Sequence, residues 1–303
     1  MIYTLTLNPS LDYIMKTKEI NIGEVNRSSE EHVLIGGKGI NVSYVLNQLG
    51  VESVILGFVA GFTGDFILKE LESLSLNQDL IKIKDGISRI NVKIKNKNET
   101  EINGKGPSIS EDEKELLIDK IKKLKNGDIL VLSGSVISNM DEFTYANILE
   151  SIEGLDVVKI VDTTGKQLLN TLKYKPFLIK PNIYELGELF DVKITKDEDV
   201  IKYSKKLIDM GAKNVLVSMD KKGAFFVNNS GYAFCRALKG KLSNSTGAGD
   251  SMIAGFIYKY LLDNDINKAF DFSVKTGSIA AFCEYLPKCC DLEVIVKHEL
   301  NTN

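Results

Sequence analysis

Histidine and cysteine are scarce in this sequence of 303 residues, and their scarcity argues against several kinds of chemistry. Only two histidines occur, His32 and His298, and neither lies near a GxSxG serine, so hydrolase chemistry of the Ser-His type lacks its parts. The four cysteines show no CxxC spacing, which argues against a zinc site. Reduced thiols in a cytosolic protein are the simpler interpretation.

A basic excess and a long apolar run are also missing. The chain has 38 Lys and Arg against 41 Asp and Glu, a formal net charge of −3, whereas a protein that binds duplex nucleic acid normally carries a strong basic excess. No run approaches the roughly 20 apolar residues that cross a bilayer, and the N-terminus lacks the basic and apolar regions of a signal peptide. We therefore expect a cytoplasmic globular protein whose partners are neither nucleic acid nor membrane.

Short apolar runs alternate with amphipathic segments along most of the chain. The predicted strands are IYTLTL, VILGFV, ILVLSGS, VVKIVDTT, FLIKPN and NVLVSM, and the last of them closes the series. Helices are predicted at 39–49, 141–152, 166–172 and within 183–210. Such alternation is typical of βαβ units. It predicts one doubly wound α/β domain over residues 1–303, with a mostly parallel sheet.

Two segments do not follow this alternation. Residues 11–35 are short and mixed in polarity, and residues 89–102, RINVKIKNKNETEI, alternate with period two around a KNKN turn. The second pattern predicts a hairpin with one solvent-exposed face. We expect the two segments to form a small antiparallel sheet that projects from the core, either as a lid over a cleft or as surface decoration.

Polar residues that directly follow the predicted strands are candidates for a binding site. Ligands of open α/β sheets bind outside the carboxyl ends of the strands. Each such residue, taken alone, is as well explained as a turn former or a helix cap. The candidates are Asn8, Asp12, Ser133, Ser135, Asp162, Lys180, Asn182 and Ser218.

The stretch NSTGAGDS, residues 244–251, lies immediately before a helical apolar pattern. Its small residues leave backbone N–H groups open to a ligand, and the amino end of a helix attracts anions. Asp250 is placed either to cap this helix or to act as a base beside a bound phosphoryl group.

Two further stretches, IGGKGIN at 35–41 and KPNIYE at 180–185, also precede predicted helices. The diglycine permits close approach of a ligand, although a simple turn explains it as well, and the stretch matches neither a Walker A loop nor GxGxxG. Asn182 and Glu185 have oxygen atoms of the kind that Mg²⁺ prefers. A capping box would explain the same Asn-x-x-Glu spacing.

Taken together, these stretches resemble the PfkB-type, ribokinase-like carbohydrate kinases. The resemblance covers nearly the whole chain, in the order TLNPSLD, GGKGIN, GFTGD, SRINVKI, LSGS, VDTTG, KPNIYEL, VSMDKKGA and TGAGDSMIAGF. TLNPSLD and GGKGIN are similar to the branch that phosphorylates sugar phosphates, which includes 1-phosphofructokinase and tagatose-6-phosphate kinase. A 6-phosphofructokinase is a close relative of that branch.

The resemblance implies a three-layer α/β/α core with a small β-sheet lid from residues 11–35 and 87–106. It implies ATP as co-substrate, Mg²⁺ as cofactor and a homodimer through the lid. The leading expectation is phosphorylation of fructose 1-phosphate to fructose 1,6-bisphosphate. The alternatives are tagatose 6-phosphate, fructose 6-phosphate and, in a different class, a non-catalytic sugar-phosphate sensor.

The resemblance also assigns roles to individual residues. Asp250 is the expected base, and the N–H groups of Gly247, Ala248 and Gly249 form the expected anion hole. The residues expected to bind the sugar phosphate are Asp12, Gly37, Lys38, Asn41, Arg89, Ser133 and Arg27, of which Arg27 is equally explained as an exposed charge. The residues expected to bind ATP are Lys180, Asn182, Ser218, Gly223, Thr246 and Gly249. Glu185 is expected to order Mg²⁺ through water.

Some positions depart from the pattern of the family. Thr246 precedes the GAGD motif where valine is common, and Asp220 adds a negative charge near the expected nucleotide. The stretch GSIAAFCEYLP only loosely resembles the helix that flanks adenine. These departures affect the expected adenine contacts and leave the expected base unchanged.

Overall fold

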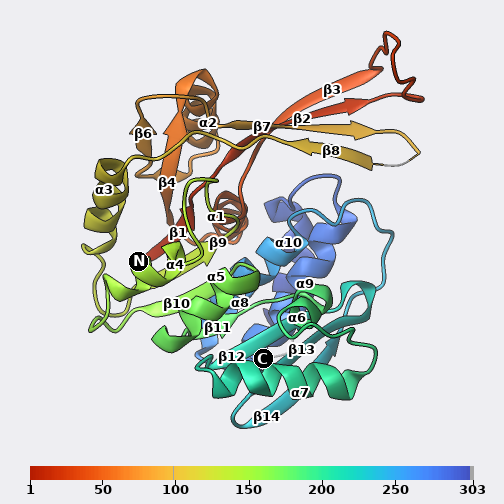
Figure 1. The fold of residues 1–303 in the computed structure, drawn as a ribbon. Helices are drawn as coiled ribbons and strands as arrows, with labels where there is room; N and C mark the ends of the chain where they lie inside the picture. The colour runs from red at the N-terminus through yellow and green to blue at the C-terminus, as the bar shows by residue number, and fades with distance from the viewer. Residues whose placement is uncertain (98, 301–303) are drawn as a thin grey trace.

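The computed structural model describes residues 1–97 and 99–300, and its core is a large sheet covered by helices on both faces (Figure 1). The strand order is β14-β13-β12-β11-β10-β9-β1-β4-β5, with β6 paired to β4. The strands are β1 (Ile2–Thr6), β4 (Val54–Ala60), β5 (Asn77–Gln78), β6 (Ile81–Ile83), β9 (Ile129–Ser133), β10 (Val158–Asp162), β11 (Leu178–Ile179), β12 (Asn214–Ser218), β13 (Gly223–Asn228) and β14 (Gly231–Arg236). Pairing is parallel from β5 to β12, which confirms the doubly wound α/β prediction.

NVLVSM, which forms β12, closes the series of parallel strands linked by helices, as predicted, but it does not close the sheet. GAFFVN and GYAFCR add β13 and β14 as an antiparallel hairpin at the edge of the sheet. β14 alternates between half-buried and exposed residues, as expected of an edge strand with one wet face. Antiparallel strands are joined by a tight turn and need no crossover helix. The alternation of strands and helices therefore ends at β12, and β13 and β14 extend the sheet beyond it.

The helices form one layer on each face of the large sheet. They are α1 (Lys38–Gln48), α2 (Gly61–Ser73), α3 (Glu111–Ile121), α4 (Thr144–Glu150), α5 (Gly165–Thr171), α6 (Ile183–Glu188), α7 (Asp197–Asp209), α8 (Ala248–Asp263), α9 (Ile266–Phe282) and α10 (Cys289–Leu300). Short 3₁₀ turns span Leu172–Tyr174 and Asp220–Lys222.

Along β9, successive buried side chains point to opposite faces of the large sheet. Leu130 and Leu132 of β9 belong to the apolar cluster that includes α3 to α7, whereas Ile129 and Val131 belong to the cluster that includes α1, α8, α9 and α10. Both faces of the strand are therefore buried, which explains its continuous apolar sequence. The arrangement confirms the expected three-layer α/β/α core.

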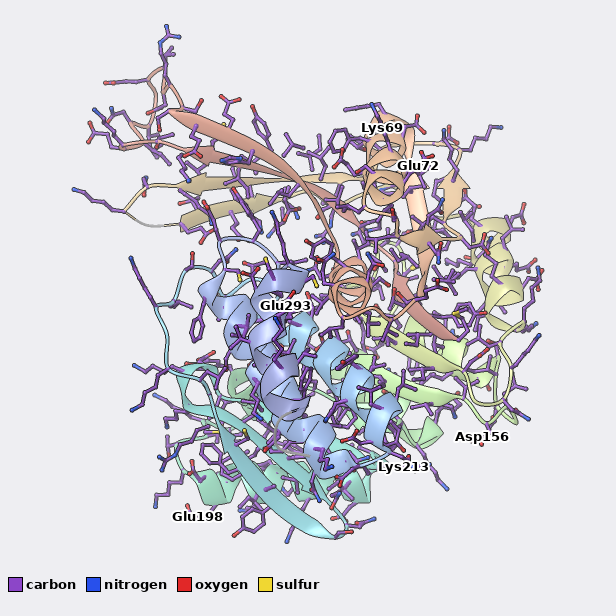
Figure 2. The ribbon with its side chains drawn as sticks, turned by 180° about the vertical axis from the view of Figure 1, so that it is seen from behind. Lys69, Glu72, Asp156, Glu198, Lys213 and Glu293 are labelled. Carbon is purple, nitrogen blue, oxygen red and sulfur yellow. The ribbon has the colours of Figure 1, made fainter. Side chains whose placement is uncertain are left out.

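The surface of the molecule carries many charged side chains, together with exposed apolar ones such as Phe62 on α2 and Leu262 on α8. Seen from behind, charged side chains point away from the core, among them Lys69, Glu72, Asp156, Glu198, Lys213 and Glu293 (Figure 2). Across residues 1–97 and 99–300, no helix is long and apolar enough to span a membrane.

A small sheet projects from the core (Figure 1). Its order is β3-β2-β7-β8, from β2 (Ser10–Lys16), β3 (Glu30–Gly36), β7 (Arg89–Lys95) and β8 (Glu99–Asn103). The β7–β8 hairpin is antiparallel, as expected, although residue 98 of the KNKN turn lies outside the described residues. The expectation of a wholly antiparallel sheet is wrong, because β2 and β7 pair in parallel. Both strands leave the core sheet and run outward, so they point the same way.

The order of the large sheet reverses at β1. This strand lies between β4 and β9, so the chain winds one way after β1 and the other way from β9 onward. A crevice forms at such a switch point, outside the carboxyl ends of the neighbouring strands.

Candidate functional site

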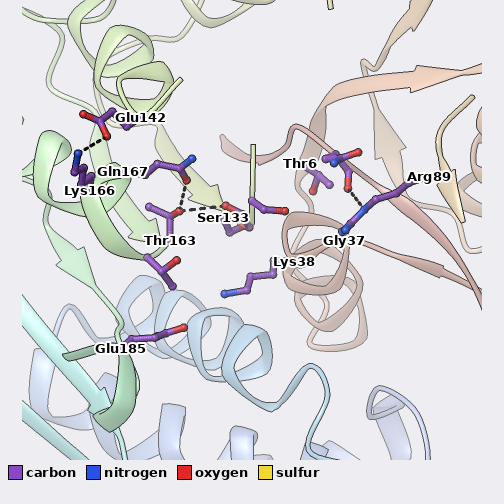
Figure 3. Close-up of a pocket in the computed structure, with 14 residues that line it drawn as sticks. Thr6, Gly37, Lys38, Arg89, Ser133, Glu142, Thr163, Lys166, Gln167 and Glu185 are labelled. Carbon is purple, nitrogen blue, oxygen red and sulfur yellow. Dashed lines mark hydrogen bonds and ion pairs between the residues drawn. The ribbon is translucent and has the colours of Figure 1, made fainter. Parts of the chain in front are cut away.

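Two adjoining cavities lie between the small sheet and the carboxyl ends of the core strands. The first, of about 610 Å³, is lined by residues that end or follow β1, β9 and β10 (Figure 3). The second, of about 1360 Å³, extends from the small sheet to the start of α8 and the end of α9. Both are lined by Gly37, Lys38, Arg89 and Glu185, so they form one continuous cleft at the switch point of the sheet.

The amino end of α8 opens onto the second cavity. Gly247 is the N-cap residue, with φ 81°, and a Cβ there would lie 2.5 Å from Leu286 Cδ2. Glycine is required at this position by both its conformation and its close packing. The first N–H groups of a helix have no partner within the helix, although the Ala248 N–H lies 3.3 Å from the Ser245 carbonyl oxygen. This end of α8 therefore has the capacity to bind an anion.

Asp250 lies in the first turn of α8 and does not cap it. The cap is Gly247, so the interpretation of Asp250 as an N-cap is wrong. Its Oδ2 instead accepts a hydrogen bond of 2.7 Å from Asn41 Nδ2 on α1. Because the helix is capped at Gly247, three residues before Asp250, the Asp250 carboxylate does not bind the backbone N–H groups of the first turn. It lines the cleft instead.

The environment of Asp250 raises its pKa to about 6. Burial is the main cause, since the residue is 5% exposed, and the negative charge of Asp162 adds to it. Lys38, Asn41 and Lys180 act in the opposite direction. A carboxylate with a pKa just below neutrality is ionised at pH 7 and is suited to accept a proton.

Asp162, at the end of β10, holds two lysines together. Its Oδ2 lies 3.2 Å from Lys38 Nζ and its Oδ1 lies 3.2 Å from Lys180 Nζ. Burial alone would raise the pKa of Asp162, but the two ammonium groups outweigh it and lower the pKa. Asp162 in turn is the main cause of a raised pKa at Lys38. The sequence marked Asp162 only as a strand-end candidate, because its two partners come from elements that meet only in the fold.

Lys180 also explains the last glycine of the GAGD motif. A Cβ on Gly249 would lie 2.8 Å from Lys180 Nζ. The glycine therefore lets a buried ammonium group approach the start of α8, where it adds positive charge to the anion site.

Arg89 and Ser133 line the first cavity together with Gly37 and Lys38 at the start of α1. The Arg89 Nε donates a 3.0 Å hydrogen bond to the Asn8 carbonyl oxygen, which orients its guanidinium group (Figure 3). Burial lowers the pKa of Arg89, although a guanidinium stays charged at neutral pH. Ser133 is 1% exposed, and its hydroxyl has no partner among the described residues. Arg27, in contrast, is exposed in the loop between β2 and β3 and lines neither cavity.

The small sheet contributes Asp12 to the cleft. Its Oδ1 accepts hydrogen bonds from Ser10 Oγ at 2.7 Å and Asn91 Nδ2 at 2.8 Å, and its Oδ2 lies 3.1 Å from Lys93 Nζ. A Cβ on Gly36 would lie 2.5 Å from Ser10 Oγ, so the first glycine of the pair leaves room for this network. The sequence did not single out Asn91 or Lys93, because they alternate like any polar face of a strand.

Asn182 and Glu185 form the capping box that was the alternative interpretation of KPNIYE. Asn182 Oδ1 accepts from the N–H groups of Tyr184 and Glu185, and Glu185 Oε2 accepts from the Asn182 N–H at 2.8 Å. Capping therefore occupies the Asn182 oxygen and one carboxylate oxygen of Glu185. Within the described part of the chain, no cluster of three or more His, Cys, Asp or Glu residues is arranged to hold a metal ion.

The remaining residues expected near ATP surround the second cavity. Its lining includes Ser218, Gly223, Thr246 and Asp220, and the end of α9 contributes Ser278, Ala281 and Phe282. Asp220 is exposed, with φ 49°. The α9 residues come from the stretch that only loosely resembles an adenine-flanking helix.

The cleft as a whole combines the Asp250 carboxylate, a helix end with the capacity to bind an anion, and the cationic side chains of Arg89, Lys38 and Lys180. Such an arrangement can remove a proton from a hydroxyl while it stabilises the charge of a transferring phosphoryl group.

Known proteins are similar to this chain in sequence and in fold. Residues 6–289 match the model of the pfkB family carbohydrate kinases. The chain is 44% identical over 286 residues to a 1-phosphofructokinase of Bacillus subtilis, with 94% of each chain covered. It is 46% identical over 292 residues to a 1-phosphofructokinase of Borreliella burgdorferi, again with 94% of each covered. A D-tagatose-1-phosphate kinase of Bacillus licheniformis is 38% identical over 287 residues, with the same coverage.

A crystal structure of phosphofructokinase-2 from Escherichia coli in complex with substrates and products has a similar fold. Its TM-score is 0.91 at 27% identity, and the match covers 98% of both chains.

Proposed function

The chain belongs to the pfkB family of carbohydrate kinases, and we propose that it phosphorylates fructose 1-phosphate with ATP to give fructose 1,6-bisphosphate and ADP. One observation carries this proposal: a single cleft holds Arg89 at one place and the ammonium groups of Lys38 and Lys180, both paired to Asp162, at another. The charges of these two lysines act on the Asp250 carboxylate and lower its pKa. Arg89 and Lys38 suit a phosphate that the substrate already bears. The names of the two relatives at 44% and 46% identity favour the 1-phosphate.

In the proposed reaction, Asp250 accepts the proton of the primary hydroxyl at C6. The hydroxyl oxygen forms a bond to the terminal phosphorus of ATP as the bond to the β-phosphate oxygen breaks, and ADP leaves. The N–H groups at the start of α8 and the Lys180 ammonium stabilise the negative charge on the transferring group. Asn41 holds the Asp250 carboxylate in place through its 2.7 Å hydrogen bond.

Glu185 fits the role of a magnesium partner, although capping occupies one of its oxygen atoms. It lines both cavities, so its other oxygen has access to a hydrated ion. Mg²⁺ usually keeps several waters and needs only one or two carboxylates beside substrate phosphates. When bound, the ion would neutralise phosphate charge.

Tagatose phosphates are the second candidate substrates, because a relative at 38% identity is a D-tagatose-1-phosphate kinase. The intact Asp250 and GAGD helix start favour an enzyme over a non-catalytic sensor, which has no need of a base.

A coupled ADP-release assay with fructose 1-phosphate, tagatose 6-phosphate and fructose 6-phosphate tests the proposal. We expect the highest kcat/KM with fructose 1-phosphate. A higher value with another sugar phosphate would reassign the substrate, and tight binding without turnover of any would favour the sensor.

We further propose that the chain is a single cytoplasmic domain and that residues 11–35 and 87–106 form its lid. Two copies would form a homodimer through this lid. The pairing register places Val33, Tyr13, Val92 and Ile102 in one row across the small sheet. Val33 is 41% exposed and Ile102 is 63% exposed, which supports a partner for this face. Light scattering of wild type and Ile102→Lys tests it: a monomeric wild type would refute the dimer.

A further inference from the structure

The small sheet presents a polar cradle to the cleft, formed by Asp12, Asn91 and Lys93. Parallel pairing of β2 and β7 sets Asp12 directly beside Asn91, and Ile14 beside Lys93. All three cradle residues line the second cavity. Asn91 is 5% exposed and Lys93 is 8% exposed, so these polar side chains are buried in a sheet that otherwise faces solvent on both edges. Their burial needs an explanation, because buried polar groups lose hydration.

The hydrogen bonds of the cradle determine the orientation of the Asn91 amide. An ionised carboxylate only accepts hydrogen bonds, so the group of Asn91 that faces Asp12 Oδ1 at 2.8 Å is its NH₂. The Asn91 Oδ1 is therefore directed away from Asp12. This buried oxygen has no donor among the described residues. An unpaired buried acceptor destabilises the ligand-free protein unless a ligand supplies the donor.

Asp12 retains an acceptor position of its own. Its Oδ1 is occupied by Ser10 and Asn91, whereas its Oδ2 contacts, among the residues that the structure describes, only Lys93, at 3.1 Å. A carboxylate offers about four acceptor sites, so Oδ2 can accept one more hydrogen bond. Burial lowers the pKa of Lys93, but the nearby charges of Asp12, Glu101 and Glu99 together outweigh it and raise the pKa, so Lys93 stays charged.

We propose that Asn91 determines sugar specificity: its Oδ1 and the Asp12 Oδ2 accept hydrogen bonds from two neighbouring hydroxyls, and Lys93 is a positioning residue that holds Asp12. The inference rests on the proposed function, since it takes the ligand to be a sugar phosphate. Two adjacent acceptors select a sugar with both hydroxyls free. A substrate that lacks one hydroxyl leaves an acceptor unpaired and is rejected.

The test compares kcat/KM of wild type and Asn91→Ala for fructose 1-phosphate and for its 3-deoxy and 4-deoxy analogues. We expect Asn91→Ala to lower kcat/KM for fructose 1-phosphate about 10- to 100-fold, the effect of one lost hydrogen bond in a buried site. With the analogue that lacks the contacted hydroxyl, the kcat/KM values of wild type and Asn91→Ala should differ by less than about twofold. Equal losses with all three substrates would overturn the hydroxyl contact.

Lys93 is tested with a matched pair of variants. Lys93→Met keeps the aliphatic stem and removes the charge, and we expect about a tenfold rise in KM for the sugar phosphate. Lys93→Arg keeps the charge and should restore KM to within about threefold of wild type. A Lys93→Arg variant as impaired as Lys93→Met would refute the positioning role.

Controls separate these effects from misfolding and from an error in the proposed function. Thr100→Ala, an exposed change on β8 of the same sheet, should leave both KM values unchanged. Each variant should have the same KM for ATP and the same midpoint of thermal unfolding as wild type. If Asn91→Ala does not fold, Asn91→Ser takes its place. If wild type turns over no sugar phosphate, the proposed function fails. Calorimetric binding of fructose 1-phosphate to wild type and Asn91→Ala then tests the cradle, and equal affinities would overturn it.

Discussion

Replacement of Asp250 by asparagine should inactivate the enzyme and at the same time stabilise its fold. The side chain is 5% exposed, and its surroundings raise its pKa from 3.8 to about 6. The native state therefore resists ionisation of this carboxyl by about two pKa units, or about 3 kcal/mol at 1.36 kcal/mol per unit. Asparagine has nearly the same shape and can still accept the hydrogen bond from Asn41.

The stability gain has a defined pH window. Above pH 6 the carboxyl is ionised in both the folded and the unfolded protein, so its full cost is present and Asp250→Asn should raise the free energy of unfolding by up to about 3 kcal/mol. As the pH falls toward 3.8, the folded protein binds a proton before the unfolded chain does. The advantage of the variant should therefore disappear near pH 4.

Urea unfolding at pH 7.5 and pH 4, together with the coupled assay, measures both effects. We expect kcat to fall about 10²- to 10⁴-fold, the usual contribution of a general base. Asp209→Asn is the matched control, because Asp209 is exposed at the end of α7 and lines neither cavity, and it should change neither quantity much. A wild-type kcat would remove Asp250 as the base, and reduced stability at pH 7.5 would refute the electrostatic reasoning.

Three further predictions concern the same cleft. The kcat/KM of wild type should fall about tenfold per pH unit below pH 6, and Asn41→Ala, which removes a donor to the ionised carboxylate, should move this limb up by about one unit; an unmoved limb would mean that another group titrates. Gly249→Ala should displace the Lys180 ammonium, raise KM for ATP and lower kcat with little change in stability, and an unaltered KM for ATP in initial-rate assays would contradict that placement. Lys38→Ala and Arg89→Ala should mainly raise KM for the sugar phosphate, whereas an effect confined to ATP would place them on the other ligand.

The motifs of the sequence located most of the cleft. Polar residues after β1, β9 and β10 line the first cavity, as the rule for strand ends predicts. The roles within each motif were less predictable. The motif by itself favours Asp250 as a helix cap over Asp250 as a base. The structure places the cap at Gly247, three residues earlier, and hydrophobic periodicity does not locate a helix start that closely. The capping box of Asn182 and Glu185 was an even alternative for the same reason.

Pairings across the chain were outside the reach of sequence patterns. Asp162 meets Lys38 and Lys180 because the end of β10 lies between the start of α1 and the residue after β11. Asn91 meets Asp12 because β2 and β7 run in parallel, against the expectation of an antiparallel sheet.

The sequence by itself determined the α/β class, the family and the short motifs, because periodicity and local glycine chemistry act over a few residues. Only the tertiary structure decided the electrostatics of the cleft. The pKa of Asp250 depends on burial and on Asp162, a residue 88 positions away in the chain. Charge interactions and desolvation depend on distances in space. These distances are set only when the sheet forms and brings residues that are far apart in the chain together.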